Sequence, residues 1–243
     1  SSPKLWNKDG TTDDFKGWLE QSGFTYVWTP PLIPCGHPDE FMFDKNADVL
    51  GKSIMDSLLA LSARTGLNAI HVNIVAHSMG GLVARRLVNK NWGDGPPAYV
   101  LAHDFAENLI MLGTPNMGSG LASISCAIGL GRGIFGCRPA SCELTYGSVS
   151  GDFGFNDRFR KRDETVYSVI AGNSCGQNVR DEPALITTQQ YAWEPLPAPP
   201  ADPAFESDCV VPVSSALGFD PFTLLPVLTW EHQYVRQLDH FDL

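Results

Sequence analysis

Ser78 is the side chain in this sequence best placed for nucleophilic chemistry. Residues 70–75 are rich in β-branched apolar side chains, as a buried strand requires, and apolar residues recur with helical spacing after the two glycines at 80–81. Ser78 therefore lies on a sharp turn between a strand and a helix, with the small residues Ala76 and Gly80 two positions away on either side. This context predicts a nucleophile elbow. The alternative is an ordinary serine that caps a helix.

A serine nucleophile requires two partners elsewhere in the chain. A hydroxyl is a poor nucleophile at neutral pH, so an imidazole must accept its proton, and a carboxylate must orient that imidazole and stabilise its charged form. Other chemistries have little support, because the sequence contains no glycine-rich phosphate loop, no His-Glu-x-x-His and no paired Cys-x-x-Cys.

Helical and strand patterns alternate through the first half of the chain. Thr11 to Asp14 precede an amphipathic stretch that predicts a helix from about residue 15 to Gly23, and Phe24–Trp28 then resembles a short strand. A second helix is predicted from Asp44 or Asn46 to residue 65, before Gly66. The elbow strand follows.

Further strands are predicted after the elbow helix, at Phe105–Leu112, Thr165–Ala171 and, more weakly, Cys209–Val213 and Gln233–Leu238. Strands that alternate with helices predict one α/β domain over residues 1–243, built on a doubly wound, mostly parallel sheet. The functional loops of such a sheet follow the carboxyl ends of its strands, where Ser78 falls.

Two segments interrupt this alternation. Residues 119–162 are rich in glycine, isoleucine and cysteine, and they predict either a lid over an active site or a surface excursion held by disulfides. Residues 195–203 contain five prolines and predict a stiff connector without regular structure.

Composition limits the partners and the compartment. The 243 residues carry a formal net charge of −10, which disfavours nucleic acid and anionic membrane surfaces. No stretch is apolar enough to span a membrane, and the N-terminus lacks the plan of a signal peptide, so we expect a soluble, already processed chain. An even set of 6 cysteines indicates disulfides in a secreted protein, with Cys175 to Cys209 as the first pairing expected.

Two strings resemble the α/β-hydrolase lipases and esterases, in particular bacterial lipases whose elbow begins with alanine. The first is Ala-His-Ser-Met-Gly-Gly at residues 76–81, a string shared with related acyltransferases and deacylases. The second is Leu-Gly-Thr-Pro-Asn-Met-Gly-Ser at residues 112–119, which is similar to the segment after the next strand in those lipases. The resemblance runs from about Phe15 to His240, and residues 119–162 match nothing in it.

This resemblance implies that the acid and then the histidine follow the serine in the chain. The acid is assigned to Asp208, because Asp-Cys-Val-Val-Pro is similar to the family's Asp-Gly-Val-Val-Pro segment, with Asp202 and Asp181 as fallback candidates. Chain order disfavours the earlier histidines, His103 among them. His240 then follows the last predicted strand, whereas His232 precedes that strand, so we expect His240 to be the base.

The resemblance also implies an oxyanion hole. The backbone N–H of Met79, the residue after the nucleophile, is the first expected donor. The second donor comes, in this family, from a loop after an early strand, and nothing upstream of Phe15 has that pattern. We expect either that an N-terminal strand is missing from this chain or that Leu5 or a neighbour supplies the donor.

These inferences together predict a secreted, monomeric serine ester hydrolase that acts on acyl esters or lipids through an acyl-enzyme, as a lipase or carboxylesterase. No cofactor is expected. A structural calcium ion is compatible with lipases of this kind, but no spacing identifies ligands for it. Two alternatives remain open: an acyltransferase with the same three residues, and an inactive binding protein that retains the fold.

Overall fold

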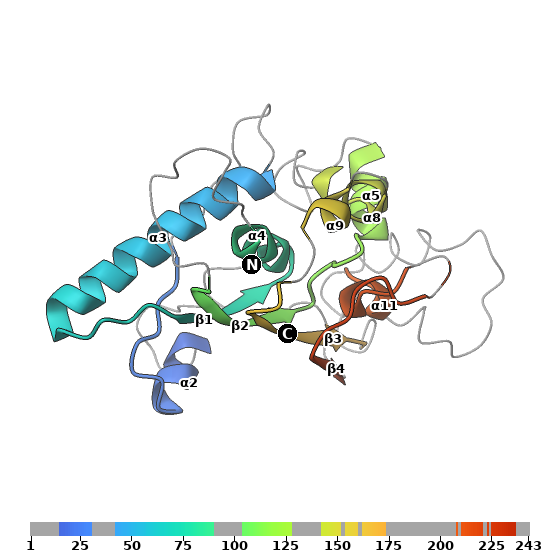
Figure 1. Cartoon of the computed structure of the whole chain (residues 1–243). Helices are drawn as coiled ribbons and strands as arrows, with labels where there is room; N and C mark the ends of the chain where they lie inside the picture. The colour runs from blue at the N-terminus through green and yellow to red at the C-terminus, as the bar shows by residue number, and fades with distance from the viewer. Residues whose placement is uncertain are drawn as a thin grey trace.

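A parallel sheet forms the centre of the molecule (Figure 1). The computed structural model describes residues 15–30, 42–89, 104–127, 142–151, 154–159, 162–173, 208, 210–220, 223 and 225–236. Among these, the strands are β1 (Val72–His77), β2 (Ala106–Leu112), β3 (Val166–Gly172) and β4 (His232–Arg236). They form a 4-stranded sheet in the order β1-β2-β3-β4, with every pairing parallel. The predicted sheet class is therefore confirmed.

The inner strands carry the core. Leu109 and Met111 of β2, and Tyr167 and Val169 of β3, have no exposed surface. Their side chains are buried because helices and loops cover both faces of a parallel sheet, which explains the nearly continuous apolar character of these strands. Strand β4, in contrast, is exposed along its length.

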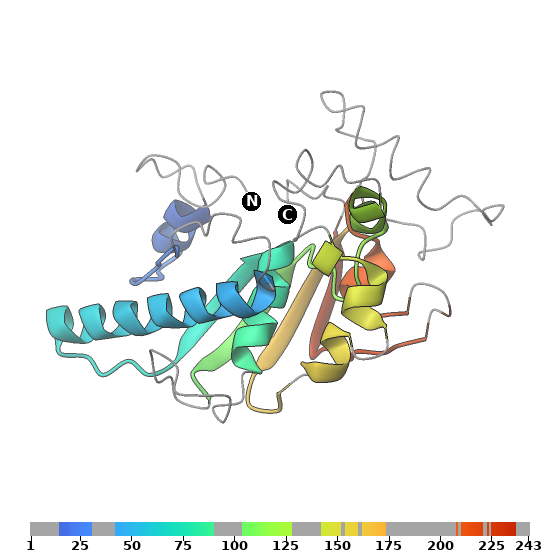
Figure 2. The ribbon, with the colours of Figure 1, turned by 90° about the horizontal axis from the view of Figure 1, so that it is seen from above.

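Helices α3 (Met42–Thr65) and α4 (Met79–Val88) pack against each other on one face of the sheet, as Figures 1 and 2 show, and α2 (Phe15–Gln21) lies on the other side. In α3 the buried residues Ala47 and Ile54 lie on one face, as the helical spacing predicts. The helix ends before Gly66, whose φ of 71° is a left-handed conformation that favours glycine. Both predicted helices are confirmed, although α3 begins at Met42, before the predicted start.

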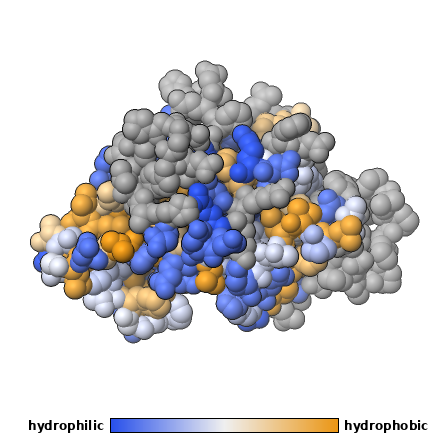
Figure 3. All heavy atoms as spheres, in the orientation of Figure 1, coloured by the Kyte–Doolittle hydropathy of each residue, from blue (hydrophilic) through white to orange (hydrophobic). Residues whose placement is uncertain are grey.

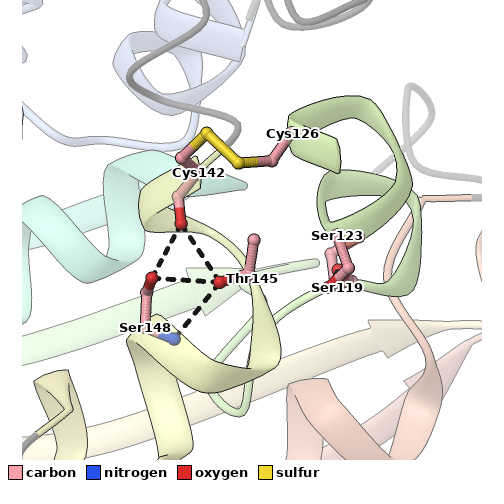
Figure 4. The surroundings of a disulfide bond; sticks show 6 residues. All are labelled: Ser119, Ser123, Cys126, Cys142, Thr145 and Ser148. Carbon is pink, nitrogen blue, oxygen red and sulfur yellow. Dashed lines mark hydrogen bonds between the residues drawn. A yellow bond between two sulfur atoms is a disulfide. The ribbon is translucent and has the colours of Figure 1, made fainter. Parts of the chain in front are cut away.

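Short helices lie within the segment from 119 to 162: α5 (Gly120–Ala127), α8 (Tyr146–Ser150) and α9 (Phe155–Arg158). Their apolar side chains Leu121, Val149 and Phe155 are buried in the main core. A disulfide joins Cys126 at the end of α5 to Cys142 (Figure 4). The expected pairing of Cys175 with Cys209 lies outside the described residues.

Two strand predictions are wrong. Residues 24–28 form no strand and have a bend at Thr25, and the aromatic side chains of Phe24, Tyr26 and Trp28 are exposed. The second is the strand predicted at Cys209–Val213. There the described residues form a turn that leads into helix α11 (Val213–Leu217). β-branched residues favoured a strand there, but the Asp208 carboxylate accepts hydrogen bonds from the Val210 and Val211 N–H groups and closes the turn instead.

Apolar surface is exposed where α3 ends and the chain turns toward β1 (Figure 3). Leu59, Leu67 and Ile70 are each at least half exposed there. No helix among the described residues is long and apolar enough to cross a membrane.

Candidate active site

Ser78 occupies the turn between β1 and α4, as predicted. Its backbone angles, φ of 55° and ψ of −132°, are rare for any residue other than glycine. No other non-glycine residue in the described ranges has a positive φ. Such a conformation costs about 1–3 kcal/mol and persists only where the surrounding structure enforces it. Here the Ser78 N–H donates to the Leu112 carbonyl oxygen at 2.8 Å, and the Gly81 N–H donates to the Ser78 carbonyl oxygen at 3.1 Å.

The tightest approach in the elbow involves Gly81 rather than Gly80. A Cβ added to Gly80 would lie 3.9 Å from the Ala76 Cβ, an ordinary contact. A Cβ on Gly81 would lie 2.6 Å from Cγ2 and 2.8 Å from Cβ of Thr114, closer than real Cβ contacts. The second glycine thus allows the elbow helix to pack directly on the loop after β2.

Met79 is the first residue of α4. The first N–H groups of a helix have no acceptor within the helix, and they point toward the positive end of its dipole. The Met79 N–H therefore has the orientation and polarity that an oxyanion donor needs, whereas Leu5, expected as a source of the second donor, lies outside the described residues.

Asp208 is buried, with 1% of its surface exposed. Its Oδ1 accepts hydrogen bonds from the N–H groups of Val210, at 3.0 Å, and Val211, at 2.7 Å. These bonds close the turn that leads into α11. They engage one carboxylate oxygen and hold the acid at a fixed place in the fold.

His240 lies outside the described residues, as do His103, Asp181 and Asp202. His232 begins β4, where it pairs with Ser168, and its side chain is exposed. Because β4 is parallel to β1, His232 lies at the opposite edge of the sheet from Ser78, which agrees with the argument against it as the base.

A loop of buried residues, Gly113–Ser119, follows β2, and we call it the connecting loop. On one side it meets the elbow, through the Thr114 contact with Gly81. Asp208 and residues 210–217 together form what we call the acid segment. On its other side the connecting loop is hydrogen bonded to this segment at Val210, whose carbonyl oxygen accepts from the Ser119 hydroxyl at 2.8 Å. One loop therefore contacts the neighbourhoods of both Ser78 and Asp208.

Arg85, two turns along α4, is a buried cation that sequence reasoning missed. Its guanidinium donates to Oδ1 of Asn116, to Oδ1 of Asn156 and to the carbonyl oxygen of Phe159. Burial lowers the pKa of Arg85 below its usual range to about 10, which leaves the side chain charged at neutral pH. An arginine on the apolar face of a predicted helix, between Ala84 and Leu87, was the available signal.

Among the described residues, no group of histidine, cysteine, aspartate and glutamate side chains is arranged to hold a metal ion. The described candidate residues offer the hydroxyl of Ser78, the carboxylate of Asp208 and the backbone N–H of Met79. That set suits nucleophilic attack on a carbonyl carbon.

Comparison with solved structures identifies the fold. The chain superposes on the mature form of a Bacillus licheniformis lipase, BlEst2, with a TM-score of 0.53 and 23% identity, over 85% of this chain and 70% of the lipase. It also superposes on the phospholipase PlaB from Legionella pneumophila with a TM-score of 0.51 and 19% identity. The fold is that of the α/β-hydrolases.

The α/β-hydrolase fold agrees with the expectation from the two sequence strings. The match to PlaB includes 83% of this chain but only 41% of that phospholipase. The match to the propeptide form of BlEst2 includes 38% of that lipase. A scan against models of known protein families found no match, and neither did a search of curated protein sequences.

Proposed function

We propose that this chain is a serine ester hydrolase that uses Ser78 as nucleophile, His240 as base and Asp208 as the acid that orients the base. The observation that carries the proposal is the strained backbone of Ser78 on a turn between β1 and α4. A capping serine would adopt ordinary extended angles and bond the first turn of the helix through its side chain, but Ser78 makes no such cap. In a nucleophile elbow, a serine on such a strained strand-to-helix turn presents its hydroxyl at the carboxyl end of the sheet.

The proposed reaction has two stages. The Ser78 Oγ attacks the ester carbonyl carbon while its proton moves to His240, and the Met79 N–H stabilises the negative oxygen that forms. The carbon–oxygen bond to the alcohol then breaks, and His240 gives the proton to the departing alcohol. A water molecule next attacks the acyl-enzyme, its proton moves to His240 and then to Ser78, and the free acid departs.

The fold neighbours support an acyl ester as the substrate class, because their names are those of a lipase and a phospholipase. We propose a lipase or carboxylesterase of this kind, monomeric and secreted, which needs no cofactor. The segment from about 119 to 162 is proposed to shape the approach to Ser78, since its described helices join the core beside the connecting loop.

Hydrolysis of p-nitrophenyl esters of increasing chain length tests the proposal. We expect Ser78→Ala to abolish turnover, and Asp208→Asn to reduce kcat by roughly a thousandfold to ten-thousandfold, because the histidine loses its orienting charge. Asp220→Asn is a matched control, since the Asp220 carboxylate also accepts a backbone N–H, from Thr223, to close a turn. If Asp208 only closed its turn, the two asparagine variants would behave alike.

Product analysis separates hydrolysis from acyl transfer. An ester with a labelled acyl group should release the free acid even in the presence of a competing alcohol. Transfer of the label mainly to the alcohol would assign an acyltransferase. A folded chain without turnover of any ester, in which Ser78→Ala changes nothing, would indicate a binding protein.

A further inference from the structure

The polar side chains of the connecting loop are fully buried. Thr114 and Asn116 have no exposed surface, and Ser119 has 1%. A buried hydroxyl or amide is costly unless it is hydrogen bonded, so the partners of Asn116 and Ser119 indicate what the loop holds in place. The Thr114 hydroxyl has no hydrogen-bond partner among the described residues.

Ser119 lies two hydrogen bonds from the carboxylate of Asp208. Its hydroxyl donates to the carbonyl oxygen of Val210 at 2.8 Å, and the N–H of the same Val210 donates to Oδ1 of Asp208 at 3.0 Å. Ser119 also receives a long bond of 3.4 Å from the Ala122 N–H, so it sits at the start of α5 (Figure 4). Movement of Val210 would therefore move the turn that holds the acid.

Ser215, on α11 of the acid segment, provides a second connection to the connecting loop. Its hydroxyl accepts a hydrogen bond from the Met117 N–H at 3.1 Å and donates to the Gly118 carbonyl oxygen. One residue further along α11, the Ala216 carbonyl oxygen accepts from Asn116 Nδ2 at 2.8 Å. The acid segment is thus fixed to the connecting loop at both of its ends.

We propose that Ser119 and Ser215 are positioning residues for the ester hydrolysis proposed above. They hold Asp208 where it orients the imidazole of His240 and stabilises its protonated form. The inference rests on that function, because it assumes that Asp208 acts on His240. Both serines act through the acid segment and not on the substrate.

Loss of this positioning has a defined chemical consequence. A carboxylate beside an imidazolium stabilises its charged form, which raises the pKa of the histidine. If Asp208 shifts away, the pKa of His240 falls, and the acidic limb of kcat/KM moves to lower pH. Transition-state stabilisation falls as well, so the loss appears mainly in kcat rather than KM.

The test compares Ser119→Ala with Ser123→Ala, the same change one turn further along. The Ser123 hydroxyl donates to the Ser119 carbonyl oxygen and makes no described bond to the acid segment. We expect Ser119→Ala to lower kcat by roughly tenfold to a hundredfold, the range caused by small misplacements of catalytic groups. Ser123→Ala should leave kcat and the pH profile close to those of the unmodified chain.

A second pair keeps the proposal testable if Ser119→Ala does not fold. Ser215→Ala removes the connection to Met117 and Gly118, whereas the hydroxyl of the adjacent, buried Ser214 makes no hydrogen bond with the described residues. Ser215→Ala should therefore lower kcat and shift the acidic limb, and Ser214→Ala should not.

NMR titration of His240 provides a readout that does not need turnover. A lowered pKa of His240 in Ser119→Ala or Ser215→Ala, at unchanged values in the controls, supports the proposal. If a folded Ser119→Ala or Ser215→Ala variant has the same pKa of His240 and the same pH profile as the unmodified chain, the proposal is overturned. Absence of ester turnover in the unmodified chain would instead count against the proposed function, so the two failures are distinguishable.

Discussion

Replacement of Arg85 by methionine should destabilise the protein substantially, although methionine retains an unbranched apolar stem like that of arginine. The guanidinium of Arg85 is fully buried, and it donates to Asn116 Oδ1 at 3.1 Å and to Asn156 Oδ1 and the Phe159 carbonyl oxygen at 3.0 Å each. Methionine supplies no donor, so these acceptors lose their partner.

Two opposing terms set the magnitude. Each buried acceptor left without a donor costs about 1–3 kcal/mol, or about 6 kcal/mol for the three acceptors of Arg85 together. Against this, burial lowers the pKa of Arg85 well below its usual range, to about 10, so removal of the charge recovers about 3 kcal/mol of desolvation. The expected net loss in the free energy of unfolding is about 3 kcal/mol.

Urea unfolding followed by tryptophan fluorescence measures this loss as a lower midpoint at an unchanged slope. Arg86→Met is the control, because the Arg86 guanidinium lies over the ring of Phe159 at 4.3 Å and the side chain is only half-buried. We expect its cost to remain under about 1 kcal/mol. Equal or greater stability of Arg85→Met would refute the reasoning, since it would mean that desolvation outweighs the hydrogen bonds.

Three further substitutions test the packing around the site, each by urea unfolding. Gly81→Ala should cost about 1–3 kcal/mol or more, because the new Cβ meets Thr114, and a wild-type midpoint would contradict this close contact. Joint replacement of Cys126 and Cys142 by serine should cost about 3 kcal/mol, as expected for a disulfide at a sequence separation of 16. Leu109→Ala, at a position with no exposed surface in β2, should cost about 2–5 kcal/mol, and a loss below 1 kcal/mol would exclude a central place for this residue in the core.

The sequence predicted the elements whose local pattern and tertiary environment agree. The strand before Ser78 and the strand ending at Leu112 are apolar because they are buried, and Gly66 follows α3 because its backbone angle favours glycine. In these places a short window of sequence contains the physical cause of the structure.

Predictions failed where distant contacts decide the conformation. The aromatic residues at 24–28 have strand propensity, but no described strand lies beside them to supply hydrogen bonds. The segment before Val213 turns because Asp208 accepts its N–H groups, and Ser119 fixes that turn from far away in the sequence. Single-residue patterns do not reveal such partners.

The same distinction applies to the candidate site. Ser78 and Asp208 were predicted as candidates from short sequence strings, whereas the bonds of Arg85 and Ser215 join segments far apart in the chain. Their partners become visible only when the loop after β2 is placed between α4 and α11.

Labelling with a fluorophosphonate tests the central claim most directly, because this probe phosphonylates a serine only where a base activates it. Peptide mass spectrometry of the folded, unmodified chain should place the adduct on Ser78, and His240→Ala should abolish labelling while it leaves the urea midpoint unchanged. An absent adduct, an adduct on another serine, or equal labelling of His240→Ala would contradict the account.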